Sequence, residues 1–164
     1  MPVKIRAVVL TDAESLRECW DAVAQERRYI YSYEAPPVSD VRTALRGSSR
    51  KKNPFLVAVD GDRVVGWASV SRAEIPSLSH NGHLTMGLHQ EYRGTGLGTK
   101  LAAEILKVSR GRFDSLTCCF FSKNKPARRL SKRMGFVLCG REKKFGKLVY
   151  GFDDQLVMQK LMRG

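Results

Sequence analysis

The sequence contains no apolar run that approaches the roughly 20 residues needed by a membrane-spanning helix. Its first residues, MPVKIRAVVLTDAESL, lack the apolar stretch and the small-residue cleavage site of a secretory signal peptide. Internal repeats and linker-like stretches are also missing. These absences predict a cytoplasmic protein in which residues 1–164 form a single domain, long enough for one hydrophobic core.

Cysteine and histidine are scarce, with four of the first and three of the second. Cys118 and Cys119 are adjacent within the apolar run LTCCFF, which predicts reduced and mostly buried thiols. The remaining cysteines and the histidines show no metal-ligand spacing, and neither a CxxC nor an HExxH motif is present. We therefore expect no metal site and no framework of disulfides.

Acidic residues are few relative to basic ones: 16 Asp and Glu stand against 29 Lys and Arg, giving a formal charge of +13. The cations cluster in RGSSRKK (46–52), KNKPARRLSKR (123–133) and REKKFGK (141–147). Such clusters attract polyanions such as nucleic acid, an anionic membrane or a phosphate-rich cofactor, or they form a solubilising surface. They lack the interleaved aromatic residues of a single-strand binder, which places binding of nucleic acid third among the hypotheses for this chain.

The patterns that are present predict alternating strands and helices. Strands are expected at 3–10, in a hairpin over 54–70 around Asp60-Gly61-Asp62, at 81–90, at 115–121, and in FVLCGREKKF and KLVYGFDDQLVMQKL (136–161). Helices are expected at 12–27, near 39–47, after residue 97 and at 125–134, with a loop at 32–40 between the first two. The resulting order, β-α-α-β-β-β-α-β-α-β-β, indicates an α/β fold around a mixed sheet.

Three local signals refine this assignment. Thr11 and Glu14 predict a capping box at the start of the first helix. Gly135 is a good stop for the helix at 125–134. Gly87, in the middle of a predicted strand, indicates a bulge or a close approach of another backbone or ligand.

The stretch EYRGTGLGTKLAAEIL (91–106) places an arginine and three glycines directly before an amphipathic helix. A helix start exposes unpaired N–H groups and a partial positive charge, and glycines allow phosphate oxygens to come close. The dinucleotide fingerprint fails because Thr99 stands at its third glycine, and the order GTK at 98–100 does not fit a P-loop. An anion site and a glycine-rich turn without a ligand remain as alternatives.

The residues Arg93-Gly94-Thr95-Gly96-Leu97-Gly98 match the pattern Q/R-x-x-G-x-G/A and resemble the acyl-CoA loop of the GNAT superfamily of N-acetyltransferases. Downstream, NKPARRLSKRMGF (124–136) is similar to that family's N-x-x-A-x-x-L-Y-x-K-x-G-F segment. The matched positions are Asn124, Ala127, Leu130, Gly135 and Phe136. The resemblance covers nearly the whole chain. It implies a GNAT-like mixed, mostly antiparallel central sheet with a splayed parallel strand pair, flanked by helices.

The resemblance also implies acetyl-CoA as the cofactor, with its pantetheine arm between strands 81–90 and 115–121 and its diphosphate on the glycine loop. The bulge expected at Gly87 would aim an N–H at the thioester oxygen. The implied contacts are Met86, Gly87, Leu88, Arg93, Gly94, Thr95, Gly96, Leu97, Gly98, Thr99, Asn124 and Arg128. Asn124 also fits a helix N-cap, and Arg128 also fits a solvated face.

Three residues are candidates for the chemistry. Ser131 stands where the family often has a tyrosine that protonates the leaving thiolate, and it is alternatively a polar helix residue. His83 is a candidate base for the acceptor amine, or a surface residue beside Asn81-Gly82. Glu34, in the loop YSYEAPP, is a candidate to hold a cationic amine, or a solvated carboxylate.

The leading hypothesis is an N-acetyltransferase that moves an acetyl group to a primary amine, on a small molecule or on a protein N-terminus or lysine, by direct attack in a ternary complex. Because Ser131 replaces the tyrosine, a CoA-binding module without turnover is one alternative. The charge of +13 suggests another, an acetyltransferase associated with nucleic acid or the ribosome. The sequence leaves open whether the chain forms a homodimer.

Overall fold

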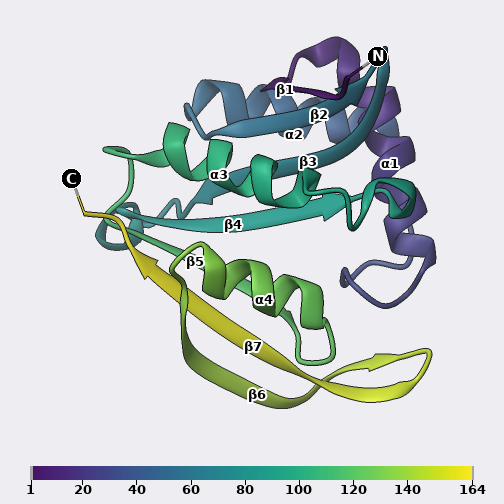
Figure 1. The fold of residues 1–164 in the computed structure, drawn as a ribbon. Helices are drawn as coiled ribbons and strands as arrows, with labels where there is room; N and C mark the ends of the chain where they lie inside the picture. The colour runs from purple at the N-terminus through teal and green to yellow at the C-terminus, as the bar shows by residue number, and fades with distance from the viewer. Residues whose placement is uncertain (1, 164) are drawn as a thin grey trace.

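A computed structural model describes residues 2–163, which form a seven-stranded sheet in the order β1-β2-β3-β4-β5-β7-β6 (Figure 1). The strands are β1 (Lys4–Ala7), β2 (Phe55–Asp60), β3 (Arg63–Arg72), β4 (Asn81–Leu88), β5 (Ser115–Phe121), β6 (Val137–Leu148) and β7 (Gly151–Leu161). The α-helices are α1 (Ala13–Gln25), α2 (Val38–Arg50), α3 (Leu97–Ser109) and α4 (Lys125–Arg133). Short 3₁₀ turns lie at η1 (Leu10–Asp12), η2 (Pro76–Leu78) and η3 (Gln90–Tyr92). The predicted order of strands and helices is confirmed.

Helices cover both faces of this sheet: α3 and α4 lie on one face, and α1 and α2 lie on the other (Figure 1). The alternation of side chains along β3 divides the core accordingly. Ala68 and Val70 pack with Leu101 of α3, whereas Trp67 packs on the opposite face with Leu16 of α1. Within residues 2–163, no helix is both long and apolar enough to cross a membrane.

The centre of the sheet contains its one parallel strand pair among the described residues, β4 with β5. The two strands pair only through their first three residues, Asn81–His83 with Ser115–Thr117. Beyond these residues β4 continues to Leu88 and β5 to Phe121 without pairing to each other. The splayed parallel pair in a mostly antiparallel sheet is confirmed.

The predicted capping box at the start of the first helix is wrong, although the helix itself begins within one residue of the predicted position. The first strand ends at Ala7, α1 begins at Ala13, and Thr11 lies inside η1 and caps nothing. Asp12 is the residue before α1, and its side chain caps no N–H of that helix. Its carboxylate instead accepts a 2.8 Å hydrogen bond from the Val9 N–H at the start of η1 and pairs with Arg6 at 2.7 Å. The hydrogen bonds from Arg6 hold the pKa of Asp12 below its usual range.

The last hairpin also differs from the prediction. The expected break near Gly146 is wrong, because β6 runs through Gly146 and the turn falls at Val149 and Tyr150. An added Cβ at Gly146 would lie 2.5 Å from the Phe121 ring, so glycine is needed for packing between strands and not for a turn. Before this hairpin, α4 ends at Arg133, and Gly135 follows the C-cap residue Met134 with φ +89°, as the predicted helix stop.

Candidate active site

The glycine loop before α3 is open on its outer side. Gly94 and Gly96 have φ of +73° and +86°, and an added Cβ at either position would meet no atom within 4 Å. The first helical bond of α3 joins the Lys100 N–H to the Gly96 carbonyl, at 3.1 Å. The earlier N–H groups of the helix therefore have no acceptor within it; the Leu97 N–H donates to the Thr95 Oγ1 at 3.4 Å, and those of Gly98 and Thr99 are available to an anion.

Arg93, which begins this loop, joins three parts of the structure. Its guanidinium makes a bidentate pair with Glu26 just after α1, at 2.9 and 2.6 Å, and lies 4.8 Å from the Tyr29 ring. Its Nε donates at 2.9 Å to the carbonyl of Leu88, the last residue of β4. These bonds use three of its five N–H donors. Arg93 thus fixes the glycine loop against the end of β4.

The predicted bulge at Gly87 is wrong, because β3 and β4 stay in register from Gly66 with Leu88 to Arg72 with Gly82. The alternative, a close approach, holds: an added Cβ at Gly87 would lie 2.0 Å from the Trp67 ring. The His89 N–H donates to the Val65 carbonyl at 2.9 Å. In an antiparallel pair every second residue directs its N–H toward the same partner strand. Because His89 bonds to β3, the N–H of Gly87, two residues earlier, also points toward β3 and not toward β5.

The same alternation points the N–H and C=O groups of Met86 and Leu88 away from β3, toward the side on which β5 runs. Because β4 and β5 are unpaired at this level, these groups face the part of the sheet where the pantetheine arm is expected. Of the three backbone contacts predicted there, Met86 and Leu88 have the required direction and Gly87 does not.

Asn124 caps α4, since its Oδ1 accepts a 3.2 Å hydrogen bond from the Ala127 N–H, and Arg128 is exposed on the same helix. Ser131 faces the sheet: its Oγ lies 3.6 Å from the Cys118 Sγ. Cys118 is the first residue of β5 beyond the paired segment, and burial raises the pKa of its thiol to about 11. Ser131 therefore lies next to a neutral thiol where the two strands begin to separate.

The other two catalytic candidates have different surroundings. His83 is the last residue of β4 that pairs with β5; it is half-buried, and its Nδ1 lies 3.5 Å from the Thr117 Oγ. Burial lowers the pKa of His83, which favours the neutral ring that can accept a proton. Glu34 is exposed between α1 and α2 and forms no hydrogen bond or ion pair through its side chain with another residue of 2–163.

The loop between α1 and α2 contacts the β6–β7 hairpin through tyrosines. The Tyr31 ring lies 5.3 Å from that of Phe121 and its hydroxyl bonds to Gln155, while the Tyr33 hydroxyl donates to the Lys147 carbonyl at 2.9 Å. Segments far apart in sequence thus meet over the carboxyl ends of the central strands. Tyr31 and Tyr33 thus pack this loop against the hairpin.

Sequence reasoning missed a pocket of about 200 Å³ lined by Arg28, Tyr29, Lys123, Asn124 and Tyr150. These residues come from the α1–α2 connection, the β5–α4 connection and the turn between β6 and β7. Among them only Asn124 was expected to contact the cofactor. The sequence offered two further signals: Lys123, the immediate neighbour of Asn124, and the aromatic run that begins with Tyr29.

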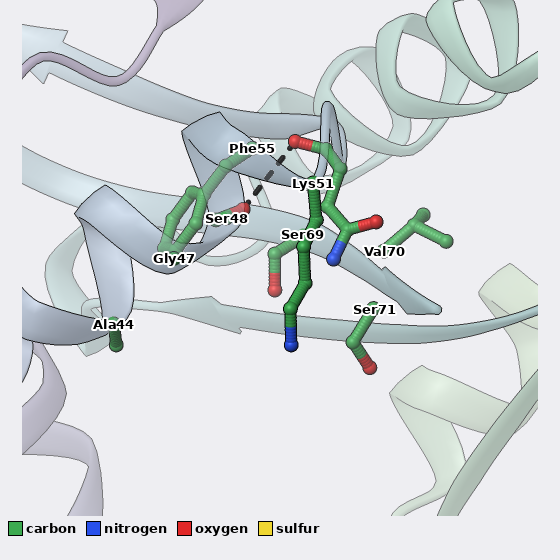
Figure 2. Close-up of a pocket in the computed structure, with 9 residues that line it drawn as sticks. Ala44, Gly47, Ser48, Lys51, Phe55, Ser69, Val70 and Ser71 are labelled. Atoms are coloured by element: carbon green, nitrogen blue, oxygen red, sulfur yellow. Dashed lines mark hydrogen bonds between the residues drawn. The ribbon is translucent and has the colours of Figure 1, made fainter. Parts of the chain in front are cut away.

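A second pocket, of about 300 Å³, lies between α2 and β3 (Figure 2). It is lined by Ala44, Gly47, Ser48, Lys51, Asn53, Phe55, Ser69, Val70 and Ser71. None of the residues predicted for the site lines this pocket. Ser71 is, however, the cross-strand partner of His83.

Comparison with known proteins gives consistent matches. The model of the acetyltransferase (GNAT) family matches residues 13–136. The L-amino acid N-acetyltransferase AaaT of Escherichia coli (strain K12) is 27% identical over 146 residues, which covers 87% of this chain and 88% of that protein. The N-alpha-acetyltransferase RimI of Mycobacterium tuberculosis (strain ATCC 25618 / H37Rv) is 28% identical over 145 residues, covering 88% and 84%.

Among solved structures, yncA of Salmonella typhimurium, a putative acetyltransferase solved with its cofactor acetyl-CoA, superimposes with a TM-score of 0.91. Its sequence is 18% identical, and the match covers 98% of this chain and 94% of that one. At 18% sequence identity, this structural similarity is evidence for a shared fold alone.

Proposed function

Because this chain belongs to the acetyltransferase (GNAT) family and is an acetyl-CoA-dependent N-acetyltransferase, we propose that a primary amine attacks the thioester directly in a ternary complex. The early end of β4–β5 pairing at His83 and Thr117 is the observation that carries this proposal. It leaves backbone groups of the central strand free to bind an extended arm as an additional strand.

The described residues fit acetyl-CoA. Gly94 and Gly96 admit a diphosphate to the start of α3, since no side chain lies where a Cβ would stand. Met86 and Leu88 direct their N–H groups toward β5, where they would bind the pantetheine arm and stabilise negative charge on the thioester oxygen. When bound, acetyl-CoA supplies the acetyl group as an activated thioester.

The acceptor amine must lose a proton, because a lysine-like amine starts near pKa ~10.4. His83 is the proposed base, acting directly or through water, since partial burial lowers its pKa and so favours the neutral ring. Ser131 is the proposed donor to the leaving sulfur, through a water. A thiol with pKa roughly 8.5 is a tolerable leaving group, so the absence of tyrosine slows this step without preventing it.

The two curated relatives are named for acetylating L-amino acids and N-alpha groups. We propose accordingly that the acceptor carries an α-amino group. The tyrosine-lined contact between the α1–α2 loop and the β6–β7 hairpin supports this side of the sheet as the acceptor side, since it adjoins the unpaired ends of β4 and β5.

A thiol-release assay on a panel of amines tests this function. The panel contains free amino acids, amino-acid amides, peptides with a free N-terminus and an N-terminally blocked lysine peptide, each with acetyl-CoA. We expect release of free thiol and acetylated product with the α-amines. Binding of CoA by calorimetry, without thiol release on any amine, would support the alternative of a binding module without turnover.

A further inference from the structure

Two cations face the 200 Å³ pocket at the end of α1 without a carboxylate partner. Arg28 and Lys123 both line it, and neither forms an ion pair with any residue in 2–163. Both approach the same ring: the Arg28 guanidinium lies 5.6 Å and the Lys123 ammonium 4.5 Å from the centroid of Tyr150. Two unpaired positive charges held in one concave place favour an anionic ligand.

The neighbouring carboxylate of Asp153 forms no ion pair with either cation, and its oxygens accept other hydrogen bonds. Asp153 is buried and accepts hydrogen bonds from the Tyr150 hydroxyl at 2.6 Å and from the backbone N–H groups of Lys123 and Asp154 at 3.2 and 2.8 Å. These bonds fix the Tyr150 ring. Asp153 therefore positions the ring on which the two cations converge.

The pocket lies beside the proposed acetyl-transfer site. Tyr29, on one wall, stacks under Arg93, and Arg93 bonds to the carbonyl at the end of β4. Asn124, on another wall, caps α4 three residues after the end of β5. A ligand in the pocket thus touches the segment that follows β5 directly, and it lies one residue, Tyr29, away from the Arg93 that binds the end of β4.

We propose that the Arg28–Lys123 pocket binds the carboxylate of the acceptor, so that the substrate is a free α-amino acid. This inference rests on the proposed N-acetyltransfer. The anionic group is assigned to the acceptor because the donor's diphosphate has its own place at the start of α3. Arginine binds a carboxylate with two parallel hydrogen bonds, whereas the neutral carbonyl of a peptide or amide gains no such pair.

The test compares a free amino acid with its amide, which keeps the α-amino group and removes the negative charge. Wild-type enzyme should show a kcat/KM for the acid ~10- to 100-fold above that for the amide, the worth of one or two charge-assisted hydrogen bonds. The variants Arg28→Gln and Lys123→Gln should each reduce this preference about tenfold, mainly through KM. Equal use of acid and amide by the wild type would overturn the proposal.

Matched controls are Arg27→Gln and Lys125→Gln, exposed neighbours that remove the same charge outside the pocket. They should keep the wild-type preference, and an equal loss in them would reduce the effect to net charge and overturn the assignment. Calorimetric titration with CoA shows whether the anion in the pocket is the acceptor's carboxylate or a phosphate of the donor. A weaker Kd for CoA in Arg28→Gln, with the acid preference intact, would assign the pocket to a phosphate of the donor.

Titration of the amino acid into CoA-bound protein tests the pocket without turnover. Binding that is present in the wild type and about tenfold weaker in both pocket variants supports the inference even where thiol release fails, in which case only the proposed function is lost. Thiol release with amides and peptides, but no binding of the free acid, keeps the function and overturns the pocket.

Discussion

At the scale of single residues, Gly87 and Gly146 share one physical reason: each lies directly beneath an aromatic ring of another strand. Added Cβ atoms would lie 2.0 Å from Trp67 and 2.5 Å from Phe121. The sequence marks Gly87 as unusual, but it cannot show which ring covers it. Strand pairing decides that, and this is why the predicted bulge is wrong.

Gly87→Ala should lower the free energy of unfolding by about 1–3 kcal/mol, because the ring and the strand must separate to admit a methyl group. Chemical denaturation of the variant measures the change. Gly47→Ala is the control, since its Cβ meets nothing within 4 Å inside α2. That change should stabilise the protein by up to about 1 kcal/mol. A Gly87→Ala variant as stable as the wild type would contradict the packing argument.

The stability of the protein should also report on His83. Burial lowers its pKa below the ordinary value of 6.5, so in the interval just under that value the unfolded chain binds a proton that the folded chain does not. The free energy of unfolding therefore falls as pH falls through this interval and is unaffected above it. Comparison of urea unfolding of wild type and His83→Gln between pH 7 and pH 5 measures the effect. Parallel curves for the two proteins would contradict it.

At the scale of elements, the loop before α3 shows how far a local motif can be interpreted. The arginine, the glycine spacing and the following amphipathic helix predict an anion-binding helix start, and the structure supplies the open backbone. The ion pair of Arg93 with Glu26, 67 residues away, could not be predicted, because no pattern relates them. The same holds for Lys123 and Arg28, which meet only through Tyr150.

Gly96→Ala should weaken acetyl-CoA binding beyond the cost of backbone strain. The substitution costs about 1–2 kcal/mol of strain at φ +86°, and its methyl group would stand where a phosphate oxygen approaches. KM for acetyl-CoA and the Kd of CoA should both rise about tenfold or more.

The matched control is Gly61→Ala in the β2–β3 turn, which has φ +59° and equally open surroundings. It should lose similar stability and keep the wild-type KM for acetyl-CoA. If both variants bind acetyl-CoA like the wild type, the glycine loop is a turn without a ligand.

For the last two strands, in contrast, the local sequence predicts the elements but not the turn between them. Their residues predict strands, yet the position of the turn is wrong by several residues because Gly146 looks like punctuation in the sequence. Two register shifts between β6 and β7, at Leu138/Gly140 and at Glu142/Gly146, absorb the extra length. Such irregularities depend on partner strands and have no local signature.

At the scale of the whole molecule, the positive charge is unevenly distributed. Residues 115–164 contain twelve lysines and arginines against three acidic residues. Five exposed cations lie on α4, namely Lys125, Arg128, Arg129, Lys132 and Arg133. Since α4 and the start of α3 lie on the same face of the sheet, this charge adjoins the glycine loop (Figure 1).

KM for acetyl-CoA should consequently rise with ionic strength, because the Debye length falls from about 10 Å at 0.1 M to about 3 Å at 1 M salt. The double variant Arg128→Gln/Lys132→Gln should raise KM at low salt and flatten its salt dependence. The double variant Arg46→Gln/Arg50→Gln on α2 removes the same charge and is the comparison. Identical salt profiles for the two would show that only net charge matters.

The sheet order places β6 at one edge, where its only strand neighbour among the described residues is β7. Detachment of β6 therefore leaves the ladder of β5 with β7 intact, so its amide hydrogens should exchange with solvent sooner than those of β7. Because Tyr33 and Tyr31 contact the same hairpin, such a local opening would also release the α1–α2 loop. The hairpin edge and the α1–α2 loop can thus fluctuate together without global unfolding.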